Sequence, residues 1–165
     1  MKYLPINSQL FINNRKRFVS KTKRNSLAVF NSNDIYNTGA DSTLPFTQHR
    51  DIFHLSGVDQ EESILVIFPD CKNKLHREIL FLKETSEHIA VWEGAKLSKS
   101  QATATSGIQT VYWLNEFDSV FPTLMAEATS FYFNNNNHYR QAVEMETRDD
   151  RFLKRIKSTY SSLEF

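Results

Sequence analysis

The 165 residues are about the length of one domain and suffice to bury a hydrophobic core. With 20 Lys plus Arg against 19 Asp plus Glu, the formal net charge of +1 gives no support for a nucleic-acid or acidic-membrane partner. The single cysteine, Cys71, excludes an internal disulfide, and the sequence has neither a signal-peptide pattern nor an apolar run of membrane-spanning length, so we expect a cytoplasmic protein.

The first half of the chain predicts one helix and a series of strands. Asn7 and Ser8 offer a helix cap, and the apolar spacing that follows favours an amphipathic helix over residues 8–22. Short apolar runs that end at turn residues then indicate strands. The predicted strands are 26–30, 52–55, 63–68, 78–82 and 89–92.

The second half alternates helices with strands. The predicted elements are helix 98–106, strand 110–113, helix 115–128, strand 131–133, a turn of four amides at 134–137 and helix 141–160. Gly107 suits a helix stop, and Pro122 implies a kink or a later start of its helix. This order predicts an α/β fold, a mixed β-sheet flanked by helices, in a single domain over residues 1–165.

Side chains that carry chemistry are present, but their spacing predicts no catalytic site. The five histidines lack the spacing of zinc sites, so we expect ordinary surface or partly buried histidines, with His54 on a strand. No base near Cys71 lowers the pKa of its thiol, and the sequence has no nucleophile elbow and no glycine-rich phosphate loop. The basic run 15–17 is typical of a solvated helix face.

An α/β sheet of this order also occurs in ribonuclease-H-like nucleases, which hold two metal ions with converging carboxylates. The candidates are Asp34, Asp41, Asp51 and Asp59, by abundance alone. Because the near-neutral charge disfavours a nucleic-acid substrate, this alternative is the weaker one.

The densest polar stretch of the chain, residues 36–57, runs directly into a short apolar segment. Taken alone, Asp41 in this stretch is a turn-capping residue, and Trp92 further on is a strand-end aromatic. Several short motifs nevertheless follow one another in a family-specific order: Ala40-Asp41-Ser42, Pro45-Phe46, Gln48, Ser56-Gly57 and Val91-Trp92-Glu93-Gly94. In these motifs the chain resembles the amino-terminal domain of Xaa-Pro aminopeptidases, in the aminopeptidase P, prolidase and creatinase superfamily.

The resemblance implies a ribonuclease-H-like domain without catalytic or metal-binding residues and without a cofactor of its own. In the family a larger pita-bread domain holds two divalent metals, usually Mn, and hydrolyses the bond between an amino-terminal residue and a following proline. That domain is absent from these residues, so we expect the chain alone to be inactive.

The resemblance further implies that Asp41 and Trp92 border the substrate entrance or a subunit interface. The implied partners are the carboxy-terminal catalytic domain of the same protein, further copies in a dimer or tetramer, and a peptide with proline at its second position. Two alternatives stay open: a free-standing peptide-binding or oligomerisation module, and the same domain of a prolidase or creatinase.

Overall fold

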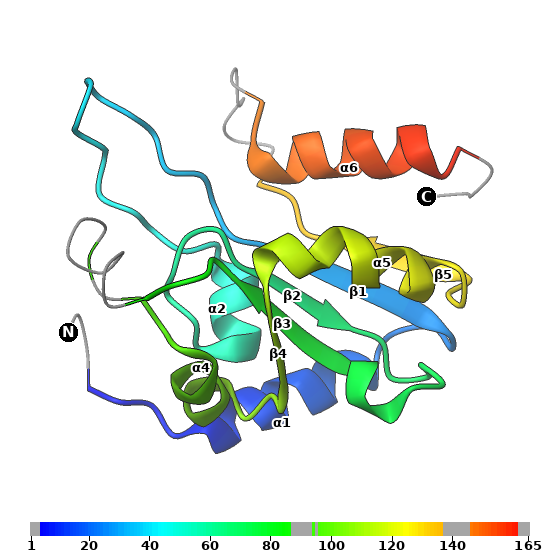
Figure 1. The fold of residues 1–165 in the computed structure, drawn as a ribbon. Helices are drawn as coiled ribbons and strands as arrows, with labels where there is room; N and C mark the ends of the chain where they lie inside the picture. The colour runs from blue at the N-terminus through cyan, green and yellow to red at the C-terminus, as the bar shows by residue number, and fades with distance from the viewer. Residues whose placement is uncertain (1–3, 87–93, 95, 137–145, 162–165) are drawn as a thin grey trace.

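A five-stranded mixed β-sheet forms the centre of the fold (Figure 1). The computed structural model describes residues 4–86, 94, 96–136 and 146–161. The strands are β1 Ser26–Asn31, β2 Ile64–Ile67, β3 Glu78–Leu82, β4 Thr110–Trp113 and β5 Ser130–Phe133. Their order is β4-β3-β2-β1-β5; the β1–β2 and β2–β3 pairs are antiparallel, and the β1–β5 and β3–β4 pairs are parallel. The predicted α/β fold with a mixed sheet is confirmed.

Helices cover both faces of the sheet. They are α1 Ser8–Val19, α2 Arg50–Ser56, α4 Lys99–Ser106, α5 Phe117–Met125 and α6 Arg148–Thr159, with two short 3-10 helices, η1 Lys74–His76 and η2 Leu114–Glu116. The helices α1, α2 and α4 lie on one side, and α5 and α6 lie on the other (Figure 1). Among the described helices, none is long and apolar enough to cross a membrane.

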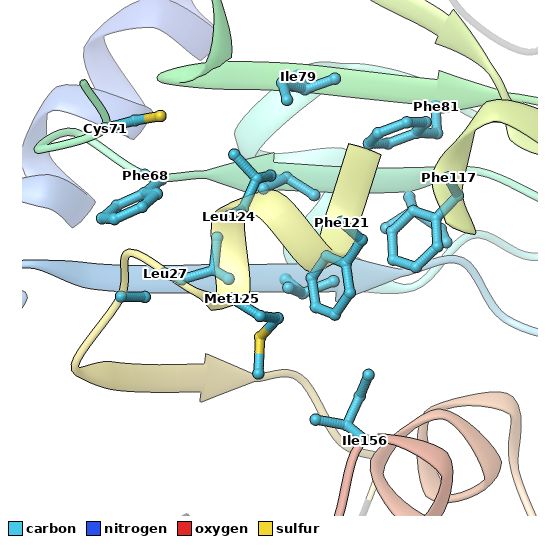
Figure 2. Close-up of a cluster of buried hydrophobic side chains, with 14 of the residues drawn as sticks. Leu27, Phe68, Cys71, Ile79, Phe81, Phe117, Phe121, Leu124, Met125 and Ile156 are labelled. Atoms are coloured by element: carbon cyan, nitrogen blue, oxygen red, sulfur yellow. The ribbon is translucent and has the colours of Figure 1, made fainter. Parts of the chain in front are cut away.

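Side-chain alternation along β1 explains the two separate cores. Leu27 and Val29 belong to the core under α5 and α6, whereas Ala28 and Phe30 belong to the core under α1, α2 and α4. Successive strand residues point to opposite faces, so a strand covered on both sides must be apolar throughout. Figure 2 shows the first core, in which Leu27 of the sheet lies near Leu124 and Met125 of α5.

The buried Arg15 of α1 holds the ends of two neighbouring helices. Its guanidinium donates to the carbonyl oxygens of Leu55 at 2.8 Å and Ser106 at 2.9 Å, and its Nε lies 3.0 Å from Oε2 of Glu78. Orphan carbonyls at two helix carboxyl ends are thereby satisfied by one cation. The prediction of a solvated basic face is therefore wrong for Arg15, although the neighbouring Lys16 and Arg17 are exposed.

The predicted strand 52–55 is wrong, because these residues form the centre of α2. His49 caps the helix, since its Nδ1 accepts from Asp51 N at 3.2 Å, and Gly57 ends it with a left-handed φ of 71°. Ile52 and Leu55, three residues apart, then face the same core. A four-residue apolar run is too short to separate the helical period from the strand period, so only the flanking caps identify the helix.

The other predicted elements agree with the described part of the chain to within a few residues. The helix containing Pro122 begins at Phe117, after the η2 turn, which agrees with the later start that was one of the two predicted alternatives. Asn134 is no simple turn residue: it is buried, and its side chain accepts from Asn31 N and donates to Asn31 O, both at 2.9 Å. The predicted strand 89–92 lies outside the described residues.

Candidate functional site

The chain between β1 and α2 forms a long loop that projects from the sheet (Figure 1). We call residues 32–49 the Asp41 loop. Its tip is closed like a hairpin, because Thr38 N donates to Ser42 O at 2.8 Å and Leu44 N donates to Tyr36 O at 2.9 Å. These two backbone bonds give the tip a defined shape although it lies outside both cores.

The Asp41 loop exposes a carboxylate at its tip and two apolar side chains elsewhere along its length. Asp41 is exposed and sits between the hydrogen-bonded positions 38 and 42. Tyr36 is 38% exposed and Leu44 is 53% exposed. An exposed carboxylate next to apolar surface can accept a hydrogen bond from an ammonium group while the apolar surface packs on a hydrophobic side chain.

The base of the Asp41 loop is fixed to residues 58–63, which we call the 58–63 segment. Ser32 N donates to Ser63 O at 2.9 Å, and Ser63 N returns a bond to Ser32 Oγ at 3.1 Å. From the other end of the loop, Gln48 Nε2 donates to Val58 O at 3.1 Å and to Gln60 O at 2.8 Å. Both ends of the loop are therefore attached to one short segment.

The opposite side of the loop base is attached to the carboxy-terminal part of the chain. Arg151 of α6 donates to Asp34 Oδ1 at 2.6 Å, and His49 Nε2 lies 3.4 Å from Asn135 O. Next to this pair, burial lowers the pKa of Arg148, although Glu62 and Asp34 act in the opposite direction. The guanidinium remains charged at neutral pH, because an arginine side chain loses its proton only in strong base.

Trp92, the second predicted site residue, lies outside the described residues. The chain that follows it is described at Gly94 and again from Lys96. Lys96 Nζ pairs with Glu61 Oε1, and Leu97 N donates to Gln60 Oε1 at 2.8 Å. The chain four and five residues after Trp92 is thus attached to the same 58–63 segment as the Asp41 loop.

An open groove of about 670 Å³ lies between α1, α2 and the end of the Asp41 loop. Its walls are mostly apolar, with Leu10, Phe11 and Phe53 among them, and the polar side chains of Arg50 and His54 also line it. Asp41 is not among the residues that line this groove. The groove and the loop tip are therefore two different surfaces.

Comparison with known proteins decides the family. The family model described as "Aminopeptidase P, N-terminal domain" matches residues 11–132, which is most of the chain. This chain belongs to the aminopeptidase P N-terminal domain family. The matched region includes both predicted site residues, Asp41 and Trp92.

Curated relatives are Xaa-Pro aminopeptidases. Human Xaa-Pro aminopeptidase 3 is 28% identical over 104 residues, which cover 62% of this chain and 20% of that protein. The Xaa-Pro aminopeptidase of Haemophilus influenzae is 23% identical over 122 residues, 74% of this chain and 28% of that protein. The chain thus spans between about a fifth and somewhat more than a quarter of the length of these curated relatives.

Solved structures show the same fold. Aminopeptidase PepP from Pseudomonas aeruginosa superposes with a TM-score of 0.77 at 18% identity, covering 97% of this chain and 34% of that one. The low-pH form of Escherichia coli aminopeptidase P gives a TM-score of 0.75 at 18% identity, covering 93% and 33%. These likenesses support the α/β assignment of this aminopeptidase P family domain.

The described part of this family member brings no catalytic or metal-binding cluster together. Within residues 4–86, 94, 96–136 and 146–161, no three His, Cys, Asp or Glu side chains form a group that could hold a metal ion. Cys71 is buried, and burial raises the pKa of its thiol, so the thiol is protonated at neutral pH. His54 is exposed on α2, not half-buried on a strand, and the buried His49 caps that helix.

Sequence reasoning missed the residues that attach the candidate elements of this aminopeptidase P family domain to each other. Gln48 is part of the family-like motif, but its bonds to the 58–63 segment are invisible in sequence. The polar run Gln60-Glu61-Glu62 directly before a buried strand is the signal that could have indicated them. Buried polar groups are nearly always hydrogen-bonded, so a polar run at this place indicates contacts with other parts of the chain.

Proposed function

We propose that this chain is the noncatalytic amino-terminal domain of a metal-dependent Xaa-Pro aminopeptidase, and that its Asp41 loop borders the substrate entrance. The family match over residues 11–132 is the observation that carries the proposal. The parent enzyme removes the amino-terminal residue that precedes a proline. Because the chain spans a minor part of its relatives, that activity belongs to a longer protein. The curated relatives favour this parent over a prolidase or creatinase.

The chemistry of the loop tip fits a peptide entrance. The Asp41 carboxylate can hold the ammonium group at the start of a peptide, while Tyr36 and Leu44 offer apolar contact to its first side chain. The indole of Trp92 would give a flat apolar wall to a proline ring. Neither group is needed for bond cleavage, so both act on the binding of the substrate.

In this proposal the reactive metals belong to the catalytic domain. Two divalent ions, Mn in the family, would supply the hydroxide nucleophile there. The described side chains of this chain offer no ligand set for such ions. The domain would work in the cytoplasm, joined to its catalytic half within a homo-oligomer.

The test is hydrolysis of an Xaa-Pro peptide with added Mn²⁺, measured for this chain and for a protein that also contains a catalytic domain. We expect turnover by the longer protein and none by this chain. Turnover by this chain itself would contradict a noncatalytic role, and a longer protein that cleaves only peptides without proline at the second position would contradict the substrate class.

A further inference from the structure

The 58–63 segment lies between the Asp41 loop and residues 96–97, which follow Trp92 in the chain. It follows α2, precedes β2, and is buried at Val58, Gln60 and Ser63. On one side it receives both ends of the Asp41 loop. On the other side it receives residues 96–97. Because it carries hydrogen bonds from both elements, it is a direct physical connection between them.

Gln60 makes contacts in both directions. Its backbone carbonyl accepts from Gln48 Nε2 and from Ser63 Oγ, both at 2.8 Å. Its side-chain Oε1 accepts from Leu97 N at 2.8 Å. The residue is 5% exposed, so water cannot replace a lost partner easily. A displacement of the backbone at Leu97 would therefore move Gln60, and with it the Gln60 carbonyl that accepts from Gln48 in the Asp41 loop.

Glu61 adds a shielded ion pair to the same side. The Lys96 side chain is 7% exposed and that of Glu61 is 18% exposed. Removal of one partner from a buried pair leaves the other charge desolvated and uncompensated, which is strongly unfavourable. The pair thus fixes position 96 much more firmly than a surface ion pair would.

The backbone of the segment is itself in an unusual conformation. Glu62 has a φ of 49°, in the left-handed region that residues with a Cβ adopt rarely. This single residue separates Glu61, which contacts Lys96, from Ser63, which contacts Ser32. Strained residues of this kind persist only where their surroundings fix them, and they are frequent at functional sites. The Glu62 side chain is held by Lys83 at 2.9 Å.

We infer that Gln60 and Glu61 are positioning residues that set the orientation of the Asp41 loop relative to the chain that follows Trp92. Neither residue touches the substrate. They act through Gln48 on one side and through Lys96 and Leu97 on the other. The inference rests on the proposed function for its effect on catalysis, but the mechanical coupling between the two elements is a property of this chain alone.

The coupling is tested by amide hydrogen exchange on this chain carrying Gln60→Ala. We expect exchange to accelerate about tenfold or more at Leu97, which loses its acceptor, and also at His49, whose amide donates to Gln48 Oε1 at 2.8 Å in the loop base. Unchanged protection at Leu65 in β2 verifies that the core stays folded. Gln60→Glu keeps an acceptor oxygen and should restore slow exchange at both positions.

Two controls separate coupling from general loosening. Gln109→Ala removes an exposed glutamine whose side chain makes a local bond, from its Nε2 to Gly107 O at 3.2 Å. Glu146→Gln removes the carboxylate of an exposed pair with Lys154. It is the matched control for Glu61→Gln, which removes the carboxylate of the shielded pair with Lys96. Neither control should change exchange at His49 or Leu97. If Gln60→Ala accelerates Leu97 while His49 exchanges at the control rate, the coupling is disproved.

The effect of Gln60 and Glu61 on substrate binding is tested in a protein that also contains the catalytic domain. Gln60→Ala and Glu61→Gln should raise KM for an Xaa-Pro peptide about tenfold with a smaller change in kcat, and Gln60→Glu should restore it. If Asp41→Ala raises KM but the Gln60 and Glu61 variants do not, the positioning role is overturned. A third outcome is that Asp41→Ala leaves KM unchanged while Gln60→Ala still accelerates exchange at His49. In that case the coupling stands and the entrance function fails.

Discussion

Single residues decide how closely the helices of this domain approach one another. Gly57 and Gly107 end α2 and α4 with φ values of 71° and 75°, and each is followed by an apolar residue that enters the core. The preceding serines are equivalent as well: Ser56 Oγ donates to Ile52 O at 2.7 Å, and Ser106 Oγ makes the corresponding bond to Ala102 O. Both helices thus end in the same way, and α1 packs on both ends.

Gly57→Ala should destabilise the domain by about 2 to 3 kcal/mol, because a Cβ there would lie 2.3 Å from the Phe11 ring and would require a left-handed backbone. Urea denaturation measures the effect as a lower midpoint. Gly39→Ala is the matched control, since nothing lies within 4 Å of its Cβ position. Equal midpoints for the two variants would show that α1 does not pack on Gly57 in solution.

At the scale of elements, the sequence identifies those helices and strands whose periodicity is long enough. The helix predicted over 8–22 is present as α1, and the apolar run 63–68 contains β2. The run 52–55 carries the same apolar signal in four residues, and there the His49 cap and Gly57 stop determine a helix. Capping by a histidine ring nitrogen is outside the usual set of capping residues, so sequence patterns alone do not reveal it.

The start of α6 is stabilised by a capping box that contains a titratable carboxyl group, that of Asp150. Thr147 Oγ1 accepts from Asp150 N, and the Asp150 carboxylate accepts from both the amide and the hydroxyl of Thr147. Two hydrogen bonds lower the pKa of Asp150 below its ordinary value of 3.8. The bond from the Thr147 hydroxyl has the larger effect, and the bond from the Thr147 amide has the smaller one. A carboxyl with a depressed folded-state pKa stabilises the fold above its unfolded pKa, and this contribution is lost as the pH falls through the folded value.

Thr147→Ala should therefore raise the pKa of Asp150 toward 3.8 and weaken α6 at neutral pH, while Thr147→Ser should retain most of the effect. NMR titration of the Asp150 carboxyl measures the pKa directly. The stability difference between wild type and Thr147→Ala should shrink as the pH is lowered below about 4. A difference that is constant from about pH 7 to about pH 2 would contradict the role of this carboxylate.

On the scale of the whole molecule, large apolar side chains remain exposed on several surfaces. Leu4 is 86% exposed, Leu75 is 67% and Leu10 is 48%. Leu10 borders the open groove between α1 and α2. A contiguous apolar surface such as the wall of this groove is typical of surfaces that contact another protein. We therefore expect the chain to associate at high concentration, which light scattering measures. A strictly monomeric profile over the whole concentration range would contradict this expectation, and Leu10→Ser tests the contribution of the groove.

The candidate site could be predicted in part from sequence. The position of Asp41 in an exposed loop follows from its polar neighbours, and the family motif indicates the loop as a site. The attachment of that loop to Val58, Gln60 and Ser63 could not be predicted, because it depends on contacts between residues 10 to 31 positions apart. Nor does any local pattern predict a left-handed Glu62, since its conformation is imposed by the contacts on both sides.

If the Asp41 loop borders the substrate entrance of an Xaa-Pro aminopeptidase, the kinetics of Asp41→Ala in a protein that includes the catalytic domain must reveal it. Asp118→Ala is the matched control, because Asp118 is an exposed carboxylate on α5 that pairs with Arg155. We expect Asp41→Ala to raise KM for an Xaa-Pro peptide about tenfold at little cost in kcat, and Asp118→Ala to change neither. Identical KM values for Asp41→Ala, the control and the wild type would contradict a role of the Asp41 loop at the substrate entrance.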